Sequence, residues 1–109
     1  MNYNVIPTEK FKKEVKRLVK KYPSLKIELT LLNDILSVEP KKGTPLGSST
    51  FKIRIAIRSK GKGKAGGARI ITYTLTEEKE VYLLTIYDKS ELDAIDDKSL
   101  KKIIKTLKS

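Results

Sequence analysis

The chain has 109 residues, and its 24 lysines and arginines against 13 aspartates and glutamates give a formal net charge of +11. That length and a hydrophobic content of 39% predict one domain, residues 1–109, with a modest core. The absence of cysteine and histidine excludes thiol nucleophiles, Cys/His zinc sites and the imidazole acid–base pair of many nucleases. With no apolar run of roughly 20 residues and no signal-peptide pattern at the start, we expect a cytoplasmic protein.

The chain opens with the pattern of a short strand and a helix. Residues 3–6 predict the strand, which Pro7 ends. Thr8 is a candidate N-cap for a helix over about 9–21, in which apolar residues recur at helical spacing. The remaining positions of that helix are mostly charged, so we expect one face of it to pack on a sheet.

A second helix and a long turn region follow. Pro23 ends the first helix, and apolar residues at helical spacing predict another over about 25–37. The two helices are therefore expected to form a helical hairpin packed on a sheet. Residues 39–50 contain two prolines and two glycines and are predicted to be turns throughout.

The second half of the chain changes from helical to strand periodicity. Residues 51–58 alternate apolar and basic or small side chains, which predicts a half-buried strand. Residues 68–75 and 81–87 predict two strands that are more apolar, and therefore central. Asp96 or Asp97 is the expected cap of a final helix. The predicted order is β-α-α-β-β-β-α, an α+β fold with a mostly antiparallel twisted sheet.

Basic side chains gather on the first of these strands and in the loop after it. The outward face of the strand carries Lys52, Arg54 and Arg58, and the four-glycine loop carries Lys60, Lys62 and Lys64. Antiparallel pairing would place Arg69 beside them, exposed at the end of the next strand. Such a cluster could position a phosphate and stabilise added negative charge on it, with the loop lysines arching over it. A solvated strand face with ordinary cations is the alternative interpretation.

Tyrosines and carboxylates offer further candidate groups. Tyr73 and Tyr87 lie near the presumed sheet face and could stack on bases or transfer protons, whereas Tyr22 is expected in the core. Carboxylates between residues 77 and 93 have the pattern of a solvated turn and a helix start rather than a metal site. They are Glu77, Glu78, Glu80, Asp88, Glu91 and Asp93.

Four segments of this chain resemble the RelE/ParE superfamily of toxins from bacterial type II toxin–antitoxin systems, and within it the HigB-like RelE branch. They are GTPLG at 43–47, FKIRI at 51–55, SKGKGKAGGARIITY at 59–73 and VYLLTIYDKSE at 81–91. Together with the element order, the resemblance covers nearly the whole chain. It implies a single RelE-like domain.

The resemblance also implies an activity, namely ribosome-dependent cleavage of mRNA in the ribosomal A site. In this family a 2′-hydroxyl attacks the adjacent phosphodiester without a metal or another cofactor. By position, Lys52 and Arg54 match the family's paired cations, and Arg69 matches the arginine that stabilises the reacting phosphate. Lys89 falls where the family often has another arginine.

The resemblance leaves the general base unassigned. RelE carries a tyrosine in its C-terminal helix near the 2′-hydroxyl, and residues 91–95 contain none. Tyr87 or a lysine with a depressed pKa could take that role. The remaining cations and tyrosines are then expected to contact RNA, namely Arg58, Lys60, Lys62, Lys64, Tyr73 and Tyr87.

Partners follow from the same resemblance. It implies a cognate antitoxin that covers the basic face or displaces the C-terminal helix, and binding to promoter DNA only as the toxin–antitoxin complex. No membrane partner is expected. Two alternatives remain open: a ParE-like toxin directed at DNA gyrase, and a nucleic-acid-binding module without chemistry.

Overall fold

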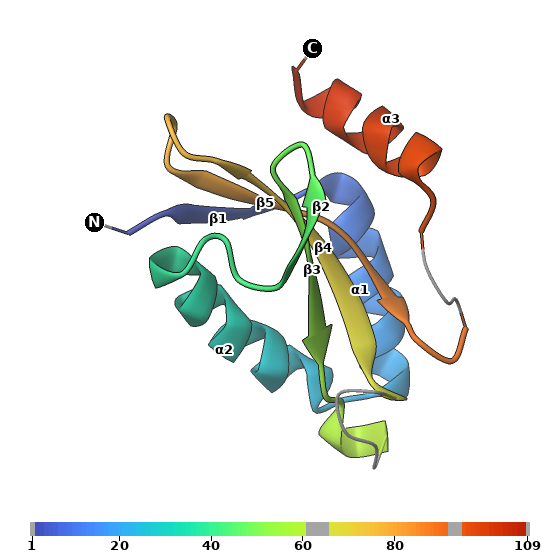
Figure 1. Ribbon diagram of the computed structural model, residues 1–109. Helices are drawn as coiled ribbons and strands as arrows, with labels where there is room; N and C mark the ends of the chain where they lie inside the picture. The colour runs from blue at the N-terminus through green and yellow to red at the C-terminus, as the bar shows by residue number, and fades with distance from the viewer. Residues whose placement is uncertain (1, 61–65, 92–94, 109) are drawn as a thin grey trace.

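The computed structural model describes residues 2–60, 66–91 and 95–108 and forms a five-stranded sheet with three α-helices (Figure 1). The strand order is β1-β5-β4-β3-β2, in which β1 and β5 are parallel and the other three pairs are antiparallel. This confirms the predicted α+β fold with a mostly antiparallel sheet and two apolar inner strands. In chain order the elements are β1 (Asn4–Pro7), α1 (Glu9–Lys21), α2 (Leu25–Val38), β2 (Thr44–Gly47), β3 (Thr50–Ile55), the 3₁₀ helix η1 (Arg58–Lys60), β4 (Ala68–Leu75), β5 (Glu80–Asp88) and α3 (Asp97–Lys108).

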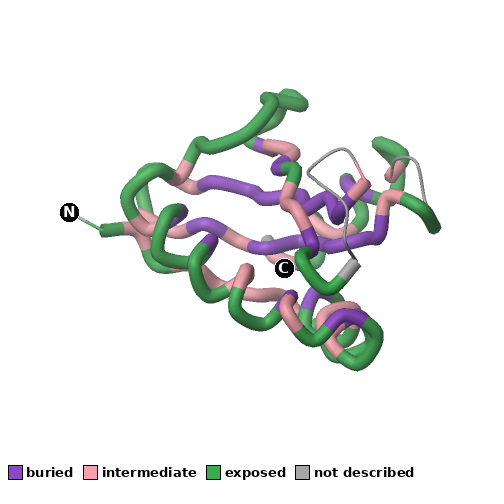
Figure 2. The backbone as a smooth tube through the Cα atoms, turned by 90° about the horizontal axis from the view of Figure 1, so that it is seen from below, coloured by how far each residue is buried: buried purple, intermediate pink, exposed green. Residues whose placement is uncertain are grey.

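Two layers of helices enclose the sheet. On one face, α1 and α2 pack on it through a core that includes Leu18, Leu25, Leu36, Ile70 and Val81. On the other face, α3 packs through Leu100 on a second cluster from β4 and β5, formed by Ile71, Tyr73, Leu84 and Tyr87. Burial is therefore concentrated in the inner strands, and the turns and outer helix faces are exposed (Figure 2).

Side-chain caps set the beginnings of two helices. The hydroxyl oxygen of Thr8 accepts from the backbone N–H of Phe11 at 3.2 Å, which confirms it as the N-cap of α1. A carboxylate oxygen of Asp96 accepts from the backbone N–H of Ser99 at 2.8 Å at the start of α3. Both helices therefore begin where the sequence predicts.

The strand β2 was not predicted, and the expectation of turns throughout 39–50 is wrong. Thr44–Gly47 pairs antiparallel with the first residues of β3, so the order is β-α-α-β-β-β-β-α. The strand could not be recognised because its hairpin with β3 contains residues typical of turns. One of them, Gly47, has a φ of +92°, which favours glycine. At Gly43, with a φ of +106°, a Cβ would collide with the carbonyl oxygen of Lys52. Glycine there allows the two strands to approach.

The strand β3 is shorter than predicted, since it ends at Ile55 and we expected it to reach Arg58. The backbone N–H of Arg58 donates to a carboxylate oxygen of Glu28 on α2 at 2.7 Å. Beside it, Ser24 and Ser59 exchange two hydrogen bonds, each from a backbone N–H to a hydroxyl oxygen, at 2.8 and 2.9 Å. These contacts hold the chain against α2 and turn it away from the sheet, so Arg58 leaves the strand face.

A bulge in β5 changes which side chains face α3. Ile71 pairs with Thr85 and Thr72 pairs with Leu83, so Leu84 is the extra residue. As a result Leu84 and Tyr87, three positions apart, belong to the same cluster under α3. The bulge therefore turns Tyr87 toward α3.

The carboxylate of Glu14 on α1 binds this bulge from the helix side. One of its oxygens accepts from the hydroxyl of Thr85 at 2.8 Å and from the backbone N–H of Ile86 at 3.2 Å. A backbone donor that the irregular strand would otherwise leave unpaired is thus satisfied by a charged acceptor.

Candidate functional site

Three polar side chains form one row across the three inner strands, near one end of each strand. Arg54 on β3 is opposite Arg69 on β4, and Arg69 is opposite Tyr87 on β5. Directly opposite residues project from the same face of a sheet, so the three side chains are neighbours. Lys52 lies two residues before Arg54 on this face. The predicted cluster of Lys52, Arg54 and Arg69 is therefore brought together, and we call it, with Tyr87, the basic row.

Arg69 is buried, which corrects the expectation that it is an exposed residue at a strand end. Only 4% of its surface is accessible, and one guanidinium nitrogen donates to the carbonyl oxygen of Ala68 at 3.2 Å. Its strand is the central one of the sheet, with β3 and β5 on either side. A charge held away from water acts on its surroundings more strongly than a solvated one, because water screens it less.

Tyr87 is also buried, at 6% exposure, and its hydroxyl has no hydrogen-bond partner among the described residues. Burial raises the pKa of Tyr87, and the positive charge of Arg69 offsets part of that rise. The phenol therefore stays protonated at neutral pH and holds an unused donor beside Arg69. Buried polar groups in proteins are nearly always paired, so an unpaired one in a row of cations suggests a place for an acceptor from a ligand.

Tyr73 is placed where it cannot stack on a base. It is 6% exposed and packs in the cluster that α3 covers, so its ring is not accessible to a base here, and its role in RNA binding stays a prediction. The burial of Tyr87 likewise keeps its ring from stacking on a base, although its hydroxyl stays in the row. Tyr22 is buried as expected.

The turn after β5 carries Lys89 and is held by a buried carboxylate. Asp88 has no accessible surface and accepts from the hydroxyl of Tyr22 at 2.9 Å. It also accepts from the backbone N–H of Ser90 at 3.0 Å and from its hydroxyl at 2.8 Å. The backbone N–H of Lys89 donates to the carbonyl oxygen of Gly67 at 3.0 Å. Lys89 therefore lies beside the start of β4, close to Arg69 in the sheet.

Asp88 was grouped with solvated carboxylates in the sequence, and that interpretation is wrong. Its position directly after a hydrophobic strand gave no sign of burial, because the partner that buries it lies 66 residues earlier, at Tyr22. A signal was available only in retrospect: Tyr22 is a core tyrosine, and a buried phenol needs a partner.

The predicted cations of the Gly-rich loop are only partly placed. Arg58 is exposed in η1 rather than on the strand, and Lys60 ends η1. Lys62 and Lys64 lie outside the described residues. At the end of the loop, a Cβ on Gly67 would collide with the carbonyl oxygen of Ile55, so this glycine is required by packing against β3.

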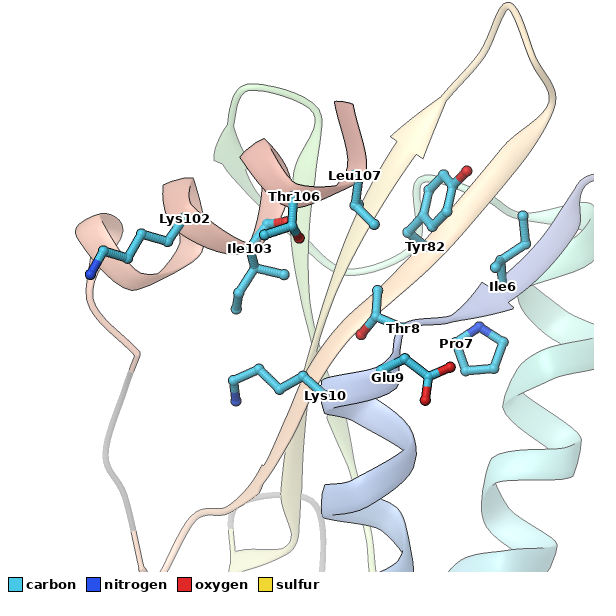
Figure 3. A pocket seen from close by; sticks show the side chains of 10 residues that line it. All are labelled: Ile6, Pro7, Thr8, Glu9, Lys10, Tyr82, Lys102, Ile103, Thr106 and Leu107. Atoms are coloured by element: carbon cyan, nitrogen blue, oxygen red, sulfur yellow. The ribbon is translucent and has the colours of Figure 1, made fainter. Parts of the chain in front are cut away.

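A cleft lies elsewhere on the described part of the molecule (Figure 3). It has a volume of about 510 Å³ and separates α3 from the junction of β1 and α1, where Ile103 and Leu107 face Pro7 and Tyr82. None of the predicted site residues lines it. A shallow hollow of about 230 Å³ does include Lys52 and Arg54. Lys52 and Arg54 therefore border an open hollow, whereas Arg69 and Tyr87 are buried.

Two further observations concern metal ligands and membrane-spanning helices. Among the described residues, no group of three or more acidic side chains is arranged to hold a metal ion. Within the same residues, no helix is long and apolar enough to cross a membrane.

The fold has a counterpart among solved structures, although no protein-family model matches the sequence. A free-state structure of the Escherichia coli toxin RelE, with two arginines replaced by alanine, aligns over 97% of this chain and 98% of its own. The TM-score is 0.61 and the sequence identity is 14%. The fold is RelE-like. At this identity the likeness concerns the backbone, and the roles of the side chains on the RelE-like sheet are argued from their own geometry.

Proposed function

We propose that this protein is the toxin of a type II toxin–antitoxin system and acts in the cytoplasm as a ribosome-dependent mRNA endoribonuclease. The observation that carries the proposal is the basic row: a buried arginine, an exposed arginine and an unpaired phenol on one face of a RelE-like sheet. A phenol hydroxyl that has no partner among the described residues and lies beside two arginines suits a site that accepts a phosphate oxygen.

We assign the steps of the proposed reaction to these groups according to how deeply each one is buried. The 2′-oxygen attacks the adjacent phosphorus and loses its proton, the bond from phosphorus to the 5′-oxygen breaks, and the 5′-oxygen takes up a proton. Arg69, which is shielded from water, stabilises the extra negative charge on the phosphate oxygens in the transition state. Tyr87 donates its free hydroxyl to the same phosphate or to the departing 5′-oxygen.

The other basic side chains bind phosphates of the RNA that flank the reacting phosphate. Arg54 is exposed and Lys52 is half-buried, so both can reach phosphates that flank the cleavage point. Lys89 and Arg58 extend the positive surface at the two ends of the row. A raised pKa makes Tyr87 a poor base, so we propose that the ribosome supplies the alignment of the 2′-hydroxyl.

The burial of Arg69 determines how the test is designed. We propose to follow mRNA integrity in a reconstituted translation reaction with the wild type, Arg69→Lys and Arg69→Met, and with a control that lacks ribosomes. Arg69→Lys keeps the charge and loses the forked donors, whereas Arg69→Met keeps most of the volume and loses the charge. Circular dichroism checks that each variant is folded.

Cleavage within codons that needs ribosomes and is lost in both folded variants is the expected result. Cleavage by folded Arg69→Met at the wild-type rate would remove Arg69 from the mechanism. Intact message with RNA binding that falls steeply with salt would indicate a binding module instead. Intact message with DNA damage in cells would indicate the gyrase-directed alternative.

The partners belong to the same proposal. A segment of the cognate antitoxin with acidic character would complement the basic surface and associate quickly with it. Promoter DNA would be bound by the toxin–antitoxin complex. The HigB-like assignment within the RelE-like group stays a prediction.

A further inference from the structure

Beyond Leu83, the outer edge of β5 is bordered by the start of α1 rather than by a strand. β1 pairs with residues 80–83 of β5 and ends at Pro7. Among the described residues no further strand lies on this side, since β1 is the edge strand of the sheet. Backbone groups at a buried strand edge need partners from elsewhere. Here α1 and its N-cap supply them, at the bulge formed by Leu84.

Thr8, the N-cap of α1, binds the bulge from one side. Its hydroxyl lies 2.9 Å from the carbonyl oxygen of Leu83 and 3.2 Å from that of Leu84. Its backbone N–H donates to the carbonyl oxygen of Leu83 at 3.1 Å. Figure 3 shows Thr8 at the point where β1 leads into α1, beside β5. The first turn of the helix and the bulge are therefore joined at one residue.

Glu14 binds the bulge from the other side and is itself held in place. One of its carboxylate oxygens accepts from Thr85 and Ile86, and the other accepts from the ammonium group of Lys10. Lys10 also donates to the hydroxyl oxygen of Thr85 at 3.1 Å. Thr85 and Ile86 are each 1% exposed. The hydrogen bonds that Glu14 accepts from them are therefore shielded from water, which strengthens them.

The bulge determines which side chain lies beside Arg69. If the pairing of β4 and β5 continued without an extra residue, Ile86 would lie opposite Arg69. Because of the bulge, Tyr87 is there instead, and Ile86 packs in the core on the side of α1. The N–H that Glu14 binds belongs to Ile86, one residue before Tyr87. A contact on the α1 side of the sheet is thus connected to the phenol on the opposite side through a single peptide unit.

We propose that Glu14 is a positioning residue for Tyr87: its carboxylate fixes the bulge of β5 and thereby the place of the Tyr87 hydroxyl beside Arg69. The catalytic consequence rests on the proposed function, whereas the placement of Tyr87 can be measured without RNA. Glu14 binds from the α1 side of the sheet and does not itself contact the reacting phosphate. Its effect on cleavage would come from geometry, since a displacement of about 1 Å can slow a reaction about a hundredfold.

A role in stability alone is the alternative explanation for these contacts. A carboxylate that only stabilises the fold would change the free energy of unfolding and leave the rate of the folded protein unaltered. A carboxylate that acts through Tyr87 would change the rate only while the Tyr87 hydroxyl is present. Combining changes at the two positions therefore distinguishes the explanations.

The first measurement uses the full chain without RNA and follows the nuclear magnetic resonance signals of the Tyr87 ring, assigned by their loss in Tyr87→Phe. Glu14→Ala should shift these signals and reduce the contacts of the ring with Leu100, which packs in the same cluster. Glu14→Gln keeps an acceptor oxygen for Ile86 and should shift them less. Glu9→Ala, an exposed change in the same helix, should leave them unchanged.

The second measurement follows cleavage in the reconstituted translation reaction. Glu14→Ala should lower kcat about tenfold and leave KM within about twofold, because the cations that bind RNA are unaltered. Glu14→Gln should restore the rate to within about threefold of the wild type. In the Tyr87→Phe background, Glu14→Ala should lower the rate by less than about twofold, since the hydroxyl that it positions is absent. Glu9→Ala should leave the rate unchanged.

Stability is measured on every variant by urea denaturation. If Glu14→Ala does not fold, Glu14→Asp takes its place, because it keeps the charge and its shorter side chain does not reach Ile86. The same shifts and the same loss of rate are expected for it.

Three results would overturn the proposal. Unchanged Tyr87 signals in a folded Glu14→Ala or Glu14→Asp variant would show that the carboxylate does not place the ring. A tenfold loss of rate that persists in the Tyr87→Phe background would show that Glu14 acts elsewhere. A rise in KM at constant kcat would assign it to RNA binding. A wild type that cleaves no message would refute the proposed function and the catalytic consequence, while the ring signals would still decide whether Glu14 places Tyr87.

Discussion

Arg69 and Tyr87 are the two buried residues of the basic row. Each is buried, one with a full charge and the other with a hydroxyl that has no described partner. Residues kept at an energetic cost are more often explained by chemistry than by packing. The lysine and arginine at the exposed end of the row carry no such cost, and we therefore assign the reacting phosphate to the buried pair.

Replacing Tyr87 with phenylalanine separates function from stability. The variant loses an unpaired buried hydroxyl and keeps the ring, so its free energy of unfolding should be unchanged or raised by up to about 1 kcal/mol. Ribosome-dependent cleavage should fall about a hundredfold, the loss typical of one donor to a developing anion. Urea denaturation and cleavage rates measure the two effects. A variant that is both less stable and fully active would contradict the assignment.

The raised pKa of Tyr87 also predicts a difference at alkaline pH. Burial raises the pKa in the folded state, so the unfolded chain loses this proton first as the pH increases. The stability contributed by the protonated phenol is complete below the unfolded pKa, near 10, and is lost as the pH rises toward the folded pKa. Tyr87→Phe should therefore lose less stability than the wild type above about pH 10. Parallel pH curves for the two proteins would be the opposite result.

Asp88 should be the most sensitive carboxylate of the described chain. Asp88→Ala removes the acceptor of the Tyr22 hydroxyl and of Ser90, and it should cost about 2 to 3 kcal/mol of unfolding free energy. In a double-mutant cycle with Tyr22→Phe, the two losses should sum to more than the loss in the double variant, because the second change removes the stranded donor. Additive losses would show that the two groups do not interact.

At the scale of single residues, alternation in the sequence placed Lys52 and Arg54 on one sheet face, and register placed Arg69 beside them. Burial could not be read in the same way. Arg69 lies on the central strand of the sheet, and Asp88 accepts a hydrogen bond from Tyr22, the residue that follows α1. Neither neighbour is visible in a local pattern.

Among the elements, β5 and β2 are the two whose structure could not be predicted from the alternation of apolar and polar residues. The alternation of β5 is interrupted at Leu84, so simple counting would place Ile86 rather than Tyr87 on the face of the basic row. The strand β2 was concealed because the residues of its tight hairpin are those of any turn. The long helices, by contrast, were predictable because their apolar spacing and caps agree.

Glu14 is predicted to hold the bulge in β5. Glu14→Ala leaves the N–H of Ile86 and the hydroxyl of Thr85 without their acceptor, and it should cost about 1 to 3 kcal/mol of unfolding free energy. Glu9→Ala, an exposed change in the same helix, should stay within about 0.5 kcal/mol of the wild type. Chemical denaturation of both variants makes the comparison. Equal effects at the two positions would mean that the bulge does not need the carboxylate.

Taken as a whole, the molecule carries its charge unevenly. Residues 1–76 hold 17 basic and 5 acidic side chains, whereas residues 77–109 hold 7 and 8. The sheet brings part of the basic excess to one open face, where Lys52 and Arg54 lie. A polyanion bound there would displace counterions, so the affinity of the whole protein for RNA should fall steeply with salt.

That salt dependence can be assigned to particular residues. For a short single-stranded RNA, each phosphate contact contributes about 0.7 to the slope of log affinity against log salt concentration. Lys52→Ala should reduce the slope by about this amount, and Lys13→Ala, on the exposed side of α1, should not change it. Filter binding across a salt series gives both slopes. An unchanged slope for Lys52→Ala would exclude that lysine from the RNA contact.

The parallel pairing of β1 with β5 has a consequence for the order in which the protein is made. During synthesis, β1 cannot pair until β5, which begins at Glu80, has been made. The basic row likewise cannot form before Tyr87 has been made. A nascent chain that has emerged only through β4 therefore has neither a completed sheet nor a completed row. For a protein proposed to attack translating ribosomes, this delay means that the site cannot form before Tyr87 has been made and has left the ribosome.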